Sequence, residues 1–519
     1  MKSRKLIPFV LMALLVASTL WAQAVGDYRT RNSGDWSNAQ IWQRYNGTTW
    51  LATATPPNGS ETILVQSSDS VYVNIPITIT GTLINRGIVN DGGNLTVGNG
   101  GTYQHDRDGG KIPTITWADG SRLLMTGTVS TAPENRNQNY YNIEFNTPSQ
   151  LSNLNMNLND ATVRGNVRVV NTGSARWYLT TALANDTAIV TILGDVIVEA
   201  GAFAVQGTSN AQTTFIVHHY GNIVVTGGNF SISRGSQPGG TTTWYLYQGD
   251  FSMANATTQS STQTPGGARF VFAKQGTQHL HLGEGNTLTA LPIEIASGTT
   301  LDMGTSKLAG NGIFVVSEGA TLMTALGGGV EEVLQSVTGA VTLAQNSSYG
   351  FNGSVHQVTS TRMPTIVADL IINNVAGVTL SQPTTINGTL RLVAGEFDNT
   401  IPFTLGPSGS ISYEGGSLKV TVSVPREQSA VPASFFVEQN YPNPFNGSTL
   451  IRFGLPGPAE VSVKIMNLLG QEVATLLAGR KTAGMHQLVF EAGELPSGVY
   501  LCRVQAGNQV EVRRIVLLK

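Results

Sequence analysis

Cysteine is almost absent from this chain of 519 residues, which contains only Cys502. An intramolecular disulfide is therefore excluded, even in an oxidising compartment. Charged residues make up only 12% of the chain, the formal net charge is −2, and acidic residues outnumber basic ones between the two ends. A basic surface for nucleic acid or for an anionic membrane is not expected. The fold must therefore depend on packing and on backbone hydrogen bonds.

Long apolar runs are lacking except at the beginning of the chain. Basic residues within the first five positions precede an apolar stretch at residues 6–20, and small residues flank Gln23. This run is shorter than the roughly 20 residues that a membrane-spanning helix needs. The pattern predicts a signal peptide at residues 1–24 that is cleaved after Ala24. The mature chain is expected to have no transmembrane segment.

Glycine is abundant, with 59 residues, and two glycine patterns recur. A Gly-Asx pair followed by apolar residues begins at Gly165, Gly194, Gly221 and Gly249, at steps of 29, 27 and 28 residues. A second pattern has two glycines seven positions apart, with apolar residues two and four positions after the first, and it begins at Gly93, Gly194, Gly221, Gly312 and Gly388. Alternating apolar positions predict short strands with one inward face. Glycine permits the corners between such strands.

A nearly constant step is typical of a β-solenoid, in which each coil pairs with the next. We therefore predict an all-β chain. The part that precedes the C-terminal domain, called the passenger below, is expected to be a right-handed parallel β-helix with coils of about 27 residues. An array of β-sandwiches is the alternative. The expected organisation is a signal peptide at 1–24, an N-terminal cap with the first strands at 25–80, β-helix repeats at 81–422, a linker at 423–434 and a C-terminal domain at 435–519. A lateral insertion is expected between residues 320 and 357.

Tryptophans cluster near the start of the predicted solenoid. Residues 34–42 resemble the beginning of many exported bacterial β-helix proteins, in which such tryptophans belong to a cap over the first coil. An open solenoid end exposes apolar surface and strand edges, so it needs a cover. We expect Trp36, Trp42 and Trp50 to supply it. An aromatic platform that stacks a sugar is the alternative.

The last 85 residues follow a different pattern. Runs with clean alternation, such as Val461, Val463 and Ile465, predict a small antiparallel β-sandwich, in which Cys502 is a buried structural thiol. Together, residues 436–446, 495–500 and 516–519 resemble the type A C-terminal sorting domain of the type IX secretion system of Bacteroidetes-type bacteria. The sorting-motif residues in this resemblance are Asn440, Tyr441, Pro442, Asn443, Pro444, Phe445, Asn446, Gly470, Gly498, Tyr500 and Lys519.

The resemblance implies a route and a set of partners. Proteins with such a domain are recognised by an outer-membrane translocon, and a sortase-like protease removes the tail. The passenger is then released or attached to surface lipopolysaccharide. The expected location is therefore the medium or the outer face of the outer membrane, reached through the periplasm with the help of the signal peptide.

Chemistry-bearing residues are few. His279 and His281 share a strand face with Glu284 nearby, a spacing that suits a metal, although a polar outer face explains it as well. The adjacent His218 and His219 are expected to point in opposite directions. Residues 105–110 resemble a calcium loop but lack its later acidic ligands, so a solvated turn is expected there. Nucleophile-elbow, zinc-helix and phosphate-loop motifs are missing. No catalytic, cofactor-binding or metal-binding residue is therefore assigned, and no cofactor is expected.

Two functional classes remain open. The first is a non-catalytic solenoid, either adhesin-like, structural or glycan-binding. The second is a polysaccharide-acting enzyme, such as a pectate-lyase-like lyase or a glycoside hydrolase, which needs charged residues stacked over successive coils. Asp195 and Asp250 occupy the Gly-Asx turn, where Asn166 and Asn222 occur equally. Because aspartate and asparagine interchange there, the pattern favours turn chemistry and the non-catalytic class.

Overall fold

The computed structural model of the protein describes residues 23–180, 187–207, 213–234, 241–259, 268–283, 287–289, 291–420, 432, 434–493 and 495–518. The chain divides into two compact units, Met1–Val420 and Thr421–Lys519. The signal peptide expected at 1–24 falls outside the described residues, apart from its last two positions. Of the linker expected at 423–434, the structure describes only positions 432 and 434.

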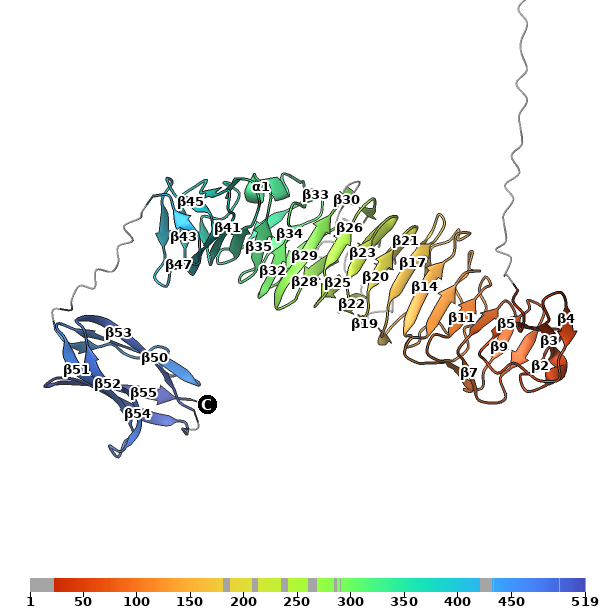
Figure 1. Ribbon diagram of the computed structural model, residues 1–519, viewed down its shortest axis with the longest axis horizontal. Helices are drawn as coiled ribbons and strands as arrows, with labels where there is room; N and C mark the ends of the chain where they lie inside the picture. The colour runs from red at the N-terminus through yellow and green to blue at the C-terminus, as the bar shows by residue number, and fades with distance from the viewer. Residues whose placement is uncertain are drawn as a thin grey trace, which may run out of the picture. The chain divides into compact units, whose positions relative to one another are not determined.

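The first unit is a parallel β-solenoid, which confirms the predicted fold class. One strand from each coil joins a long ladder, and each of its strands pairs in parallel with a strand of the next coil. Figure 1 shows these strands side by side. The ladder contains β5 (Thr62–Val65), β8 (Thr82–Asn85), β11 (Thr102–His105), β13 (Arg122–Met125), β14 (Asn142–Asn146), β17 (Val167–Asn171), β20 (Val196–Val198), β23 (Ile223–Val225), β26 (Phe251–Met253), β29 (Gly276–Leu282), β32 (Thr299–Asp302), β35 (Thr321–Thr324), β38 (Ser348–Phe351), β41 (Leu370–Asn373), β44 (Thr389–Ala394) and β47 (Ser410–Tyr413).

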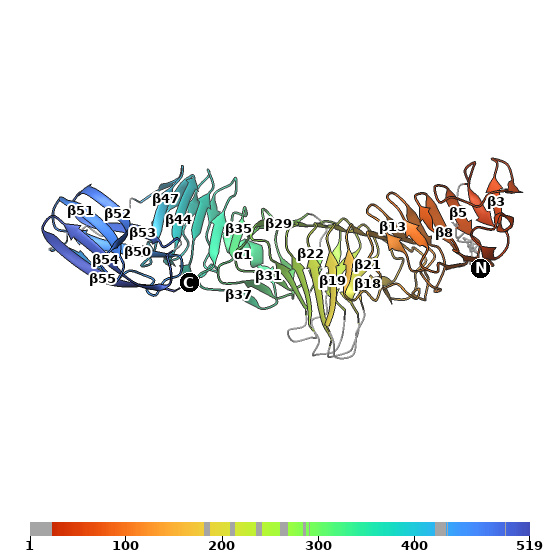
Figure 2. The ribbon, with the colours of Figure 1, turned by 90° about the horizontal axis from the view of Figure 1, so that it is seen from below.

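Two further sheets close the middle coils, so that each coil has three sides. The second side contains β15 (Leu154–Asn155), β18 (Arg176–Tyr178), β21 (Ala202–Gln206), β24 (Asn229–Ser233), β27 (Thr257–Gln259) and β30 (Thr287–Thr289). The third contains β16 (Ala161–Val163), β19 (Thr187–Ile192), β22 (Thr214–His219), β25 (Thr242–Leu246), β28 (Ala268–Phe272), β31 (Ile293–Ile295), β34 (Phe314–Val316) and β37 (Val341–Leu343). Figure 2 shows β18, β19, β21 and β22 extending to one side of the solenoid.

Smaller sheets close the coils at both ends of the first unit. Near its beginning these contain β2 (Gly34–Asp35), β6 (Ser70–Tyr72) and β9 (Ile88–Asn90), then β7 (Ile77–Ile79), β10 (Leu95–Val97) and β12 (Thr116–Trp117). Towards its end they contain β33 (Ala309–Gly310) and β36 (Ser336–Val337), then β39 (Gln357–Val358), β42 (Val378–Thr379), β45 (Glu396–Asp398) and β48 (Ser417–Leu418), and finally β40 (Ile366–Val367), β43 (Thr384–Ile386) and β46 (Phe403–Leu405). The three-sided coil therefore persists along the unit.

The recurring glycines have two separate physical reasons. A Cβ on Gly221 would lie 2.1 Å from the carbonyl oxygen of Gly194, and one on Gly249 would lie 2.0 Å from that of Gly221. These glycines therefore form a column in which successive coils approach too closely for any side chain. Further along the coil, Gly201 and Gly228 have φ of +78° and +71°, which L-residues with a side chain rarely adopt. The first glycine of each pair thus permits close approach, and the second permits the corner.

The expected coil length of about 27 residues is wrong outside the middle of the solenoid. Thr62, Thr82 and Thr102 are paired in successive coils, a step of 20 residues. Leu370 and Leu390 show the same short step towards the other end. The middle coils are longer partly because strands of the third side such as β19 and β22 have six residues each, whereas β7 and β9 have three.

Irregularities in the repeat include a sideways step in the long ladder and a short helix within one coil. The end of β29 pairs with β26 through Leu280, whereas its beginning pairs with β32 through Gly276, so the ladder steps sideways at this strand. Gln278 is buried at the step and donates to the carbonyl oxygens of Leu246 and Gly249 at 3.1 and 2.7 Å. The short helix is α1 (Gly329–Leu334), which lies within the expected insertion.

The second unit consists of two antiparallel sheets, as predicted. One contains β49 (Phe436–Val437), β50 (Ser448–Leu455) and β53 (Gly484–Glu491), and the other contains β52 (Glu472–Lys481), β51 (Ala459–Met466), β54 (Gly498–Ala506) and β55 (Gln509–Leu517). Alternate residues of both sheets, among them Phe453, Val463 and Ile515, form one buried cluster. Cys502 lies in this cluster, and burial raises the pKa of its thiol to about 12. The thiol is therefore protonated at neutral pH and inert.

Candidate functional site

The sorting motif at residues 440–446 is folded onto the last strand of its unit. The Asn443 side chain donates to the carbonyl oxygen of Arg514 at 3.2 Å and accepts from the backbone amide of Val516 at 2.8 Å. The amide of Phe445 donates to the Val516 carbonyl, and the Phe445 ring is buried 5.9 Å from that of Phe490. The beginning and the end of the unit are therefore joined through this motif.

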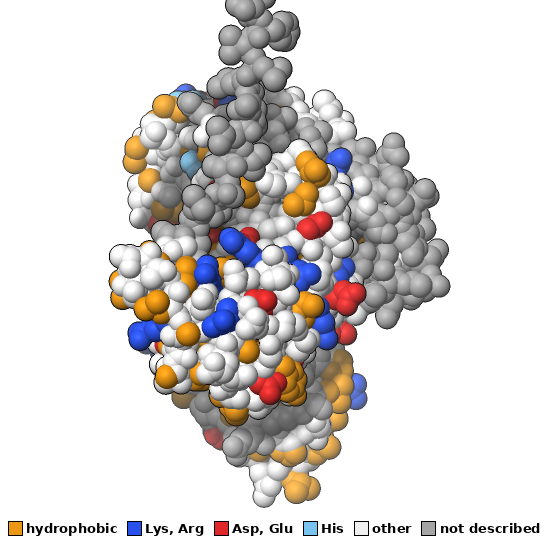
Figure 3. Space-filling view, turned by 90° about the vertical axis from the view of Figure 1, so that its right-hand side faces the viewer, with side chains coloured by type: hydrophobic (Ala, Val, Ile, Leu, Met, Phe, Trp, Pro, Cys, Tyr) orange, Lys and Arg blue, Asp and Glu red, His pale blue; other side chains and the backbone are white. Residues whose placement is uncertain are grey.

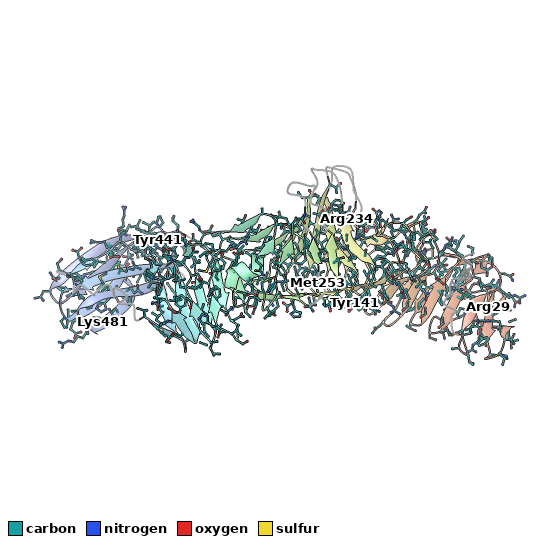
Figure 4. All side chains as sticks on the ribbon, turned by 90° about the horizontal axis from the view of Figure 1, so that it is seen from above. Arg29, Tyr141, Arg234, Met253, Tyr441 and Lys481 are labelled. Atoms are coloured by element: carbon teal, nitrogen blue, oxygen red, sulfur yellow. The ribbon has the colours of Figure 1, made fainter. Side chains whose placement is uncertain are left out.

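Asn440 and Tyr441, two neighbouring residues of the sorting motif, differ in their exposure to solvent. Asn440 is buried, and its side chain donates to Thr449 Oγ1 at 2.9 Å and to the Pro442 carbonyl at 3.1 Å. Tyr441, labelled in Figure 4, lies at the surface of the unit and is 80% exposed. The motif therefore contains a buried asparagine that holds its own backbone in place and an aromatic side chain that is exposed to solvent.

The remaining sorting-motif residues lie elsewhere in the unit. Gly470 has φ of +79° in the turn between β51 and β52, and Gly498 begins β54. The hydroxyl of the buried Tyr500 donates to the carbonyl of Pro496 at 2.8 Å, as in the tyrosine corner of other sandwiches. Lys519 lies outside the described residues. These residues shape turns and the core and do not converge on one catalytic point.

Two of the three tryptophans near the N-terminal end are buried in the interior of the first unit. Trp36 and Trp42 are fully buried with their rings 5.1 Å apart, and their indole nitrogens donate to the carbonyls of Pro57 and Trp36. Neither ring can stack a sugar. Trp50 is half-buried under the guanidinium of Arg29, at 4.6 Å from the ring centroid. Figure 3 looks onto this end and shows hydrophobic side chains in scattered groups between polar and basic ones.

The loop that resembles a calcium site uses its carboxylates within the protein. Asp108 Oδ1 accepts three backbone amides of the next coil, from Val129, Ser130 and Thr131, at 2.8 to 2.9 Å. The pKa of Asp108 is lowered, because these hydrogen bonds outweigh the opposing effect of its partial burial. Asp106 pairs with Arg86 at 2.6 Å. The loop therefore connects coils and is more than the solvated turn expected from the sequence.

His279 and His281 both project outward from β29, as predicted. His279 Nδ1 lies 3.2 Å from Asp250 Oδ2, and the backbone amide of His279 donates to the same carboxylate. Glu284 lies outside the described residues. Among the residues that the structure describes, no group of three or more histidine, cysteine or acidic side chains is arranged to hold a metal ion.

Two other histidines are buried inside the solenoid. The Nε2 atoms of His105 and His219 each lie 2.8 Å from a backbone carbonyl oxygen, of Gly109 and Gly194 respectively. Burial lowers the pKa of both to about 4, so both are neutral at pH 7. As expected, His219 points inward while its neighbour His218 lies on the outer face.

The Asx residues of the Gly-Asx pairs form a ladder along one corner of the solenoid. Asn166 Oδ1 accepts the backbone amide of Asp195 at 2.8 Å, Asp195 Oδ1 accepts that of Asn222 at 2.7 Å, and Asn222 Oδ1 accepts that of Asp250 at 3.0 Å. The ladder continues to His279 through Asp250. Aspartate and asparagine therefore do the same work, which is to accept one amide from the next coil.

A row of alternating charges crosses neighbouring coils of the long ladder and was not predicted from the sequence. Arg122 and Arg168 reach the same Glu144 oxygen at 3.2 and 3.3 Å, and Arg168 also reaches Glu199 at 2.8 Å. The hydrogen bond to Glu199 raises the pKa of Arg168. Glu144 and Arg168 occupy equivalent positions in successive coils, and this opposite charge at equivalent positions was the available signal. It can be recognised only when the register between the short strands is known.

An array of four aromatic rings on the outer face of the third side was also missed. His218 and Tyr220 come from one coil, and Tyr245 and Tyr247 come from the next. Ring centroids are 5.2 to 6.0 Å apart with planes within 27° of parallel. Successive side chains of a strand point to opposite faces, so the neighbours of the buried Trp244 and His219 could have been predicted to point outward. We call these four residues the aromatic array.

Comparison with known proteins identifies only the C-terminal unit. Residues 439–518 match the model of the secretion system C-terminal sorting domain. No curated protein and no solved structure matched the chain. In the part of the chain that the structure describes, no helix is long and apolar enough to cross a membrane. The protein is therefore a parallel β-helix passenger that carries a type IX secretion C-terminal sorting domain, which directs it to the cell surface or the medium.

Proposed function

We propose that the passenger is a non-catalytic surface solenoid, adhesin-like, structural or glycan-binding, that acts after export. The observation that carries the proposal is the Asx ladder. Asp195 and Asp250 are the acidic residues of the recurring Gly-Asx pairs. Each accepts a hydrogen bond from a backbone amide of the following coil. Their carboxylates therefore stabilise the stack and are not free for acid–base chemistry.

The sorting domain is proposed to act as an export signal that is cleaved from the passenger. Its sorting motif contacts the translocon, a sortase-like protease removes the unit, and the passenger is released or joined to lipopolysaccharide. Entry into the periplasm uses a signal peptide cleaved after Ala24, which is exposed at the beginning of the described residues. The passenger then remains on the outer face of the outer membrane or leaves the cell.

Deletion of residues 435–519 tests this export signal. The truncated protein is expected to accumulate inside the cell envelope, while the full chain reaches the surface or medium. Fractionation followed by immunoblotting measures both pools, and an unrelated periplasmic protein controls for leakage. Wild-type amounts of the truncated protein outside the cell would contradict the proposal.

A polysaccharide-acting enzyme is the alternative, and the row of Arg122, Glu144, Arg168 and Glu199 is the observation that favours it. Enzymes of this kind stack charged residues over successive coils. Here each carboxylate is already paired with an arginine of a neighbouring coil, so neither is free to act on a substrate without first breaking an ion pair. The exported protein, incubated with acidic and neutral polysaccharides, is expected to leave their chain length unchanged. Cleavage that is lost in Glu144→Gln would establish the enzyme instead.

A further inference from the structure

The aromatic array is built by the register of two adjacent strands. β22 and β25 lie side by side, and His218 pairs with Tyr245. Tyr220 and Tyr247 directly follow these strands and continue the same ladder. Their backbone amides donate to the carbonyl oxygens of Ile192 and His219, respectively, each in the preceding coil. The rings therefore stand as two pairs across one coil step.

The four rings are also held by polar contacts and by each other. The Tyr220 and Tyr247 centroids lie 5.2 Å apart, and those of Tyr245 and Tyr247 lie 5.8 Å apart. His218 Nδ1 lies 3.1 Å from the Tyr247 hydroxyl. All four side chains remain partly exposed. The array is thus a fixed surface feature that needs little ordering when a ligand arrives.

Small residues follow the array along the solenoid. Beyond Tyr247, the equivalent positions of the next coils are Ala273, Ala296, Ser317 and Ala344, whose amides continue the same hydrogen-bond ladder. Each of them is partly exposed. A methyl or hydroxymethyl group cannot cover the neighbouring tyrosine ring. Tyr247 therefore forms a wall at the end of a low shelf, which these four small residues define.

The charges around the shelf are balanced. Arg269 and Glu294, on the adjoining outer positions, pair with each other at 3.0 Å. Lys274 and Glu318 follow two of the shelf residues and have opposite signs. A polyanion or a polycation therefore finds no matching field here. The surface instead offers ring faces, hydroxyls and small side chains.

We propose that the array and its shelf bind a neutral polysaccharide, with one sugar ring stacked on Tyr247 and the chain lying along the shelf. The C–H face of a sugar carries partial positive charge and complements the negative face of an aromatic ring. Coils repeat about every 4.8 Å, so two coils span about 10 Å and successive sugars meet equivalent positions. This inference rests on the proposed binding role of the passenger and names its ligand and site.

A protein partner fits this surface less well. Stable protein interfaces need a broad apolar centre with large anchors. Here the bulky rings are confined to two coils, and the shelf beside them has only small side chains. A second copy of the chain is nevertheless an outcome that the experiment must distinguish.

Affinity electrophoresis of the exported full-length protein tests the site. Gels contain a neutral polysaccharide such as a soluble β-glucan or xylan, or an acidic one such as polygalacturonate. Neutral gels are expected to retard the wild type. Tyr247→Ala is expected to weaken binding about tenfold, whereas Tyr247→Phe retains most of it because the ring remains. Tyr413→Ala, at an exposed tyrosine of β47, is the matched control and should bind as the wild type does.

A second variant protects the test from a folding defect. Ala296→Ile fills the shelf with a branched side chain that offers no ring face, and it leaves the array intact. It should also abolish retardation at an unchanged melting temperature. Unchanged binding by both Tyr247→Ala and Ala296→Ile would overturn this site and would place any glycan binding elsewhere on the passenger. Retardation in acidic gels only, no retardation at all, or a dimer that dissociates in Tyr247→Ala would also overturn it. Shortened polysaccharide would instead overturn the non-catalytic function.

Discussion

The backbone amide of Asn222 donates to the Oδ1 of Asp195 at 2.7 Å, one coil earlier in the solenoid. The Asn222 side chain donates to the same oxygen at 3.1 Å. Asn222 then accepts the amide of Asp250. This relationship converts a local Gly-Asx turn into a continuous ladder, and it explains why either amino acid satisfies the position.

The ladder predicts different effects for two substitutions of Asp195. Asp195→Ala removes the acceptor and is expected to lower the free energy of unfolding by about 1 kcal/mol. Asp195→Asn keeps an acceptor oxygen and should stay within about 0.5 kcal/mol of the wild type. Urea unfolding followed by circular dichroism measures both. Equal losses in the two variants would show that the negative charge, and not the hydrogen bond, is what matters.

The buried histidines predict a loss of stability in mild acid. The pKa of His105 and His219 is about 4 in the folded protein and 6.5 as the ordinary value, so the unfolded chain binds protons first as the pH falls. Stability is therefore present above pH 6.5 and declines between pH 6.5 and 4, by up to about 3 kcal/mol for each histidine.

Glutamine substitutions separate this effect from carboxylate titration. His219→Gln keeps a donor for the Gly194 carbonyl but cannot titrate. Melting temperatures measured from pH 6.5 to 5 should fall less steeply in His219→Gln, and least in the double variant with His105→Gln. The same steepness in the wild type and the double variant would exclude these histidines as the cause.

The sorting motif predicts separable effects on folding and export. Phe445→Ala removes a buried ring and should destabilise the C-terminal unit by about 3 kcal/mol. Tyr441→Ala changes an exposed side chain and should leave the stability within about 0.5 kcal/mol, yet reduce export if this ring meets the translocon. Thermal unfolding and cell fractionation measure the two effects. Normal export of a stable Tyr441→Ala protein would remove Tyr441 from the recognition surface.

The different burial of Trp42 and Trp50 predicts a graded effect of their substitution on stability. Trp42→Ala empties a fully buried site and should cost about 3 to 5 kcal/mol. Trp50→Ala removes a half-buried ring that contacts Arg29 and Tyr45, and each of these contacts is worth about 0.5 to 1 kcal/mol. Limited proteolysis near this end should follow the same order. A similar loss in both variants would indicate that Trp50 also closes the core.

Much of the fold could be predicted because its determinants are local and repetitive. The Gly-Asx steps indicated stacked coils, and alternation around Val463 indicated the sandwich. The short coils were missed because the repeat length came from Gly-Asx pairs in the middle of the chain, between residues 165 and 249, and strands such as β7 and β9 have only three residues. Thr82 and Thr102, each after a glycine, were the available signal. The charged row and the aromatic array were missed because both depend on which residues of different coils are in register.

The sequence by itself determined the class of this protein: glycine spacing specified a solenoid, and the sorting motif specified a route out of the cell. Only the tertiary structure decided how its side chains meet. His218 and Tyr245 become neighbours, and Arg168 joins Glu144 to Glu199, through pairing between coils. These residues are 24 to 31 positions apart in the sequence, and they come together because a parallel ladder places each coil directly beside the next.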